Sequence, residues 1–108
     1  MPGDTEYGRD LLKVFVPFCE HLIAGGLTRK TIRRHMDYLW LLGGELIEEI
    51  NEHEELRKKP AAALIMDNIS DDGGPYIRHL ESEADMRSFD ATCRKFYKFF
   101  KRTSEEIG

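Results

Sequence analysis

The sequence is 108 residues long, 41% hydrophobic and 33% charged, and it carries a formal net charge of −4. This length and balance predict one globular domain and exclude a disordered chain. Net acidity argues against a protein that coats nucleic acid indiscriminately, but it leaves room for a local basic face. No basic leader with an apolar stretch after it opens the sequence, and the longest apolar run, Ala61 to Met66, is too short to cross a bilayer. We therefore expect a cytoplasmic protein without membrane contact.

The N-terminal region combines proline, two glycines and mixed charge, which predicts a flexible arm over residues 1–9. A single helical domain is expected over 10–102, followed by a frayed tail over 103–108.

The first expected helix begins at Asp10, where apolar residues start to recur at helical spacing. Gly25 and Gly26 then give a strong C-terminal signal. Pro17 lies inside this pattern and predicts a kink or an opened second half, because it cannot donate to the preceding turn.

A longer amphipathic helix is expected from Thr28, a plausible N-cap, to about Arg57. Its apolar stripe keeps its phase across Gly43 and Gly44, which favours one helix over two, although adjacent glycines are costly in a helix. Gly43 lies in the stripe itself, where a missing side chain lets another helix approach closely. The stripe consists of Ile32, Met36, Leu39, Gly43, Leu46, Ile47 and Ile50.

Charges on this long helix oppose the helix dipole, which favours acids at the N-terminus and bases at the C-terminus. One interpretation is a solvated surface in which Arg33 pairs with Asp37. The other is a functional surface, because a broken local rule without compensation tends to mark function. The basic start holds Arg29, Lys30, Arg33 and Arg34, and the acidic continuation holds Glu45, Glu48, Glu49, Glu52, Glu54 and Glu55.

Three shorter elements are expected next. Pro60 opens a short helix that ends near Ile69, residues 71–74 form a loop by composition, and Pro75 opens a brief helix that ends near Glu83.

The last expected helix runs from an N-cap at Ser88 to about Arg102 and has a clear division of faces. Tyr97 and Phe99 flank the seam between them, and Trp40 and Tyr38 of the long helix are interpreted as core and seam residues. The apolar face holds Phe89, Cys93, Phe96 and Phe100, and the basic face holds Arg94, Lys95, Lys98, Lys101 and Arg102.

Residues that could carry catalysis lack the spacing that catalysis needs. Cys19 and Cys93 have no paired spacing and predict free buried thiols in a reducing compartment. Asp71 and Asp72 lack further ligands at calcium-loop spacing, so they predict a turn. We expect no enzyme, cofactor, metal or small-molecule substrate. The histidines, His21, His35, His53 and His79, stand singly on expected helices.

Several short motifs resemble the N-terminal core-binding domain of tyrosine recombinases and phage integrases. They are Phe18 to Leu22, Gly26-Leu27-Thr28, Thr31 to His35 with Leu39, Ser88, Arg94 and Phe96 to Phe100. The resemblance covers residues 8–102 and implies a SAM-like fold of four or five helices that clamps duplex DNA. The catalytic arginine, histidine-x-x-arginine and tyrosine set does not follow, so recombinase activity is not implied. The resemblance implies that the residues in contact with DNA are Arg29, Lys30, Arg33 and Arg34, together with Lys95, Lys98 and Arg102.

Together these observations predict an all-α, SAM-like orthogonal bundle of about five helices with one long central helix. The leading functional hypothesis is a small, non-catalytic module that binds duplex DNA. The alternative is a protein-interaction or self-associating module that uses its acidic long helix. Whether Gly43 and Gly44 interrupt that helix is left open.

Overall fold

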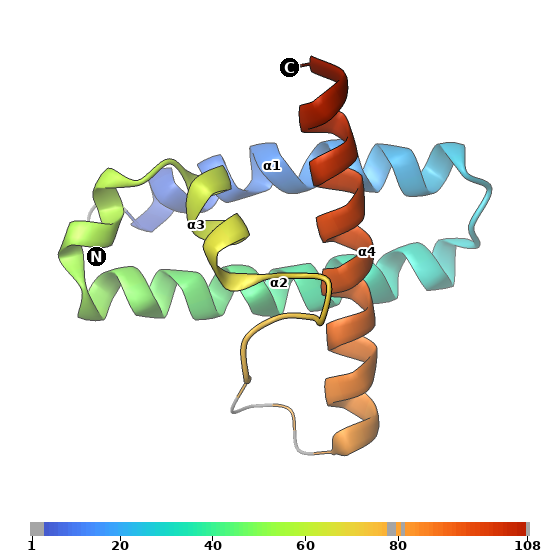
Figure 1. Ribbon diagram of the computed structural model, residues 1–108. Helices are drawn as coiled ribbons and strands as arrows, with labels where there is room; N and C mark the ends of the chain where they lie inside the picture. The colour runs from blue at the N-terminus through green and yellow to red at the C-terminus, as the bar shows by residue number, and fades with distance from the viewer. Residues whose placement is uncertain (1–3, 78–79, 81, 108) are drawn as a thin grey trace.

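A computed structural model describes residues 4–77, 80 and 82–107, and this part of the chain is helical without any named strand (Figure 1). The predicted all-α class is confirmed. Four α-helices are present where about five helices were expected, and the SAM-like arrangement stays a prediction. The elements are α1 (Asp4–Ala24), α2 (Arg29–Glu52), the 3₁₀ helix η1 (Glu54–Lys58), α3 (Ala61–Asn68) and α4 (Glu83–Ile107).

The turn between α1 and α2 forms as the sequence predicts. Gly26 has a φ of 80°, a left-handed conformation that glycine adopts without steric cost. The Thr28 hydroxyl accepts a hydrogen bond of 3.2 Å from the Thr31 backbone N–H, so Thr28 is the N-cap of α2. The two helices leave this turn antiparallel and side by side (Figure 1).

Helix α1 begins at Asp4, six residues before the expected start at Asp10. Tyr7 explains the extension, because its ring is buried and its hydroxyl donates to the Lys59 carbonyl at 3.2 Å. The assignment of residues 4–9 to a flexible arm was therefore wrong. The helix continues through Pro17, and at the other end of the chain α4 extends through the expected tail to Ile107.

Helix α2 is continuous through Gly43 and Gly44, which answers the question left open by the sequence. Gly43 is buried, and a Cβ there would lie 3.6 Å from the Phe15 ring, so this glycine sits directly against α1. A Cβ on Gly44 would meet nothing within 4 Å. The helix ends at Glu52, and η1 rather than further α-helix carries the chain to Lys58.

The segment before α4 differs from the expectation. Pro60 directly precedes α3, as expected, but residues 75–77 and 80 are not helical, and the rest of that expected helix lies outside the described residues. Helix α4 begins at Glu83, because Ser82 accepts a hydrogen bond of 3.0 Å from the Asp85 backbone N–H. Ser82, and not Ser88, is therefore the residue in the N-cap position.

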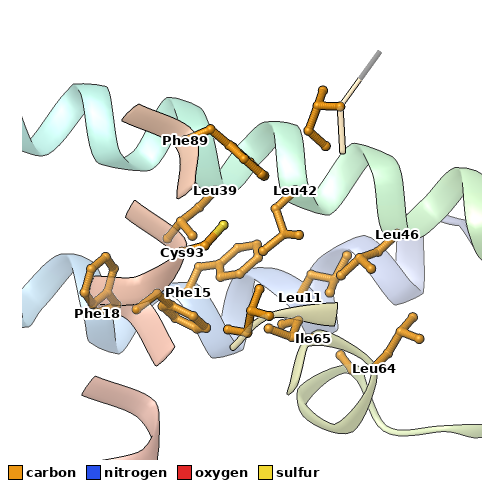
Figure 2. Close-up of a cluster of buried hydrophobic side chains, with 14 of the residues drawn as sticks. Leu11, Phe15, Phe18, Leu39, Leu42, Leu46, Leu64, Ile65, Phe89 and Cys93 are labelled. Atoms are coloured by element: carbon orange, nitrogen blue, oxygen red, sulfur yellow. The ribbon is translucent and has the colours of Figure 1, made fainter. Parts of the chain in front are cut away.

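Helix α4 runs across the α1 and α2 pair, and an aromatic cluster holds it there (Figure 1). The ring of Phe96 lies edge-on to Phe15 and Phe18, with centroids 5.6 and 5.2 Å away. Edge-to-face pairs of this kind contribute about 0.5–1.5 kcal/mol beyond their burial. Figure 2 shows Leu11, Phe15, Phe18, Leu39, Leu42, Leu46, Leu64, Ile65, Phe89 and Cys93 converging from all four α-helices.

The loop after α3 packs directly on α4 through two glycines. The Gly74 backbone N–H donates to Asp90 at 3.1 Å, and a Cβ on Gly74 would lie 2.6 Å from the Cys93 sulfur. Gly73 has a φ of 136°, and a Cβ there would collide with the Asp90 side chain. The expected loop is thus a close backbone contact with the last helix.

We predict opposite effects from alanine at two glycines. Gly44→Ala should raise the free energy of unfolding by about 0.5–1 kcal/mol, because alanine favours the helix and the added methyl meets nothing. Gly74→Ala should lower it by about 1–3 kcal/mol, because the added methyl overlaps Cys93 and Phe89. Urea unfolding of both variants checks this, and a stabilising Gly74→Ala would contradict the described loop packing.

We also predict that the two thiols differ in reactivity. Burial, with a smaller contribution from the charge of Asp90, raises the pKa of the Cys93 thiol to about 12, whereas Cys19 is only half-buried. A Cys19→Ser variant should therefore resist a thiol-reactive disulfide reagent at neutral pH until urea unfolds it. A Cys93→Ser variant is the matched control and should react in the native state. Equal native rates for both variants would contradict the burial of Cys93.

Candidate nucleic-acid interface

The basic residues at the start of α2 are all exposed, but they point to two different sides of the helix. At about 100° per residue, Lys30 lies about 40° from Arg34, on one side. Arg29 and Arg33 lie within about 20° of Trp40, on the other side. The pairing of Arg33 with Asp37 is not among the ion pairs of the described residues. The four residues therefore do not form a single basic patch.

The basic residues of α4 share one broad face but differ in their contacts. Lys95, Lys98 and Arg102 follow one another at helical spacing and share one flank. Arg94 lies about 40° from Lys98, at the edge of this face, where its guanidinium donates to the Asp72 carbonyl at 3.4 Å. Lys101 lies over the Tyr97 ring, 5.8 Å from its centroid.

A hydrogen bond ties the first half of α2 to the middle of α4. Nδ1 of His35 lies 2.7 Å from Oγ1 of Thr92, a buried hydroxyl that needs a partner. Burial lowers the pKa of His35, and the positive charges of Lys95 and Arg34 lower it further. The contact of His35 with Thr92 therefore joins the two helices that carry the predicted basic clusters.

Beside this contact, α4 and the end of α1 enclose a shallow hollow of about 340 Å³. His21 of α1 packs its ring 4.8 Å from the Phe99 centroid and forms one wall. Among the residues that the structure describes, none that lines the hollow is acidic. We call the surface formed by His21, Arg34, His35, Lys95, Lys98 and Arg102 the basic corner.

The basic corner extends around the edge of α4. Lys98 and Arg102 also line a second hollow with Lys101, Tyr97 and Asp71. Ammonium and guanidinium groups on an exposed helix offer several donors to phosphate oxygens, and arginine can bind them in a bidentate manner. The corner therefore has the chemistry of an anion-binding surface.

Sequence reasoning identified the cations of the corner but missed His21 and His35. These two histidines belong to the basic corner only because α4 crosses the other helices, and no spacing of residues within one helix encodes that crossing. The interpretation of Trp40 as a core or seam residue was wrong, because its side chain is 67% exposed. Its position about 100° from the buried Leu39 was the available signal.

Comparisons of the chain with known protein families, with curated proteins and with solved structures found no match. The resemblance to integrase core-binding domains thus stays a prediction. Within the described ranges, no group of three or more His, Cys, Asp or Glu side chains is placed to hold a metal ion. None of the helices in the described part of the chain has both the length and the apolar character to span a bilayer.

We predict that His35 makes stability depend on pH. Its folded-state pKa lies below the ordinary value of 6.5, so between these two values the unfolded state binds more protons. The contribution of neutral His35 to the free energy of unfolding is complete above pH 6.5, and it is lost as the pH falls through the folded-state pKa. Urea unfolding at about pH 7.5 and about pH 5 should show a larger loss for the natural protein than for His35→Gln. Equal losses in both proteins would contradict this role.

Proposed function

We propose that the protein is a small, non-catalytic module that binds duplex DNA through the phosphate backbone, with the basic corner as its contact surface. The observation that supports it most is the hollow lined by Lys95, Lys98 and Arg102, in which none of the described lining residues is acidic. Contacts between basic side chains and phosphates fix the position of a protein on a duplex, and they carry no sequence information by themselves.

The dimensions of α4 fit this role. Lys95 and Arg102 are seven residues apart, which is about 10.5 Å along the helix axis. That length corresponds to about three base-pair steps of a DNA strand, so the cations can meet successive phosphates. The resemblance to the core-binding domain supports the same role, and it places the contact on several of the same residues.

The distribution of charge is compatible with DNA binding only if the acidic end of α2 is kept away from the ligand, because acidic side chains repel an anionic duplex. The acids of α2 satisfy that condition, since Glu45 to Glu52 lie in its second half, which runs away from α4 (Figure 1). An anionic duplex at the basic corner therefore avoids the acidic end. The net charge of −4 then limits nonspecific coating of nucleic acid and favours a local contact.

We predict salt-sensitive binding of a labelled generic duplex, measured by fluorescence anisotropy. With three or four phosphate contacts, the logarithm of the affinity should fall with the logarithm of salt concentration with a slope of about −3 to −4. The double variant Lys98→Glu, Arg102→Glu should abolish measurable binding at low salt.

His35 should titrate at a higher pH in the complex, because a phosphate beside Lys95 favours the imidazolium.

Arg87→Glu is the matched control for this experiment. Arg87 is exposed on α4, outside the basic corner, and its reversal makes the same change in charge per residue. It should reduce affinity only slightly. A loss from Arg87→Glu as large as that from the double variant Lys98→Glu, Arg102→Glu, or no binding of the natural protein at low salt, would contradict the proposal.

A further inference from the structure

One face of α1 and α2 carries exposed apolar side chains, and it lies away from α4, because Trp40 is about 140° around α2 from His35, which contacts Thr92 of α4. Leu12 and Val16 of α1 are 40% and 46% exposed, and Trp40 of α2 is 67% exposed. The molecule measures 39 × 38 × 23 Å, and its shortest dimension is about two helix diameters. α1 and α2 therefore form one layer of a thin slab. Among the residues that the structure describes, no further layer covers their outer face, which is defined by Leu12, Val16 and Trp40.

A groove runs beside Trp40 on this outer face. Its volume of about 120 Å³ is well below the roughly 300–1,000 Å³ of small-molecule sites, so it suits an inserted side chain better than a ligand. Every residue that lines it is apolar or glycine. The lining includes Gly8 and Leu12 of α1 and Trp40, Gly43, Gly44 and Ile47 of α2.

We propose that a second copy of this chain covers the outer face, in a two-fold dimer that inserts Trp40 of each copy into the groove of the other. A two-fold interface needs a self-complementary patch. Here the protruding indole and the groove lie side by side on one surface, as that symmetry requires. A large exposed aromatic beside a glycine-lined groove is also the kind of anchor that dominates interface energies.

The charges of α2 are complementary to those of an antiparallel copy. The first half of the helix has four basic residues and one acid, and the second half has four acids and no base. Trp40 lies at the middle, with eleven residues of α2 before it and twelve after it. Of these charges, Arg29 and Arg33 lie within about 20° of Trp40 around the helix and Glu48 lies about 80° from it, so an antiparallel pair that crosses at Trp40 brings the bases of each copy toward Glu48 of the other.

One specific pair follows from this register. Arg33 lies seven residues before Trp40 and Glu48 lies eight residues after it, which is about 10.5 and about 12 Å along the axis. Both side chains are exposed. In the two-fold arrangement, Arg33 of each copy meets Glu48 of the other, and the pair occurs twice. This also relieves a charge order that opposes the dipole of α2 itself.

Sedimentation velocity between about 5 and 500 µM, the range in which interfaces of modest area assemble, tests the dimer in the absence of DNA. The natural protein should pass from monomer to dimer, and its single tryptophan should shift its emission to the blue as the indole leaves water. Trp40→Glu should weaken association at least about thirtyfold. Tyr76→Glu is the control, because Tyr76 is equally exposed, at 73%, and lies outside the outer face.

Charge reversal tests the register. Arg33→Glu alone and Glu48→Arg alone should each weaken association roughly tenfold, because each replaces two attractive pairs with two repulsive ones. An equimolar mixture of the two variants should form a heterodimer at least as tightly as the natural protein, because both of its pairs are again opposite in charge. A monomer throughout the range, an unaffected Trp40→Glu variant, or a mixture no tighter than its components would overturn the proposal.

Discussion

The contact of Phe96 with Phe15 and Phe18 is the constraint on which the rest of the structure depends. α1 and α2 alone bury one stripe of each helix and leave the other side of the pair in water. The edge-to-face packing of Phe96 holds α4 across that side. Lys95, next to Phe96 in sequence, is thereby fixed beside α2, and Phe99 is fixed beside His21. The position of the basic corner is therefore a consequence of core packing.

This packing collects like charges around His35. The lowered pKa of His35 records the effect, because its desolvation and the cations around it all disfavour the imidazolium. The histidine is retained as a neutral partner for the buried Thr92 hydroxyl. The exposed cations are screened by water and salt, so their mutual repulsion costs the fold little. None of the ion pairs among the described residues uses Lys95, Lys98 or Arg102, so the proposal assigns these cations to a ligand.

Much of the fold follows from local rules. The stripe of α2 at helical spacing, the Thr28 cap and the Gly26 turn were predictable, because neighbouring residues determine them. The start of α4 was not, because Ser82 and Ser88 both fit an N-cap in sequence and only tertiary packing selects between them. For the same reason, the site cations were predictable as helix faces, whereas the inclusion of His21 and His35 depends on contacts between residues distant in sequence.

The two proposed surfaces belong to different layers of the molecule, and this separation has a consequence for assembly. Figure 1 shows α4 crossing the α1 and α2 pair. The groove of the outer face is lined by α1 and α2 alone, whereas the hollow of the basic corner is lined by α4 and the end of α1. A dimer closed through the outer faces therefore leaves both corners uncovered and directs them away from each other. In the proposed dimer, a straight duplex at one corner would not reach the other, so the two proposals together assign a separate segment of DNA to each protomer.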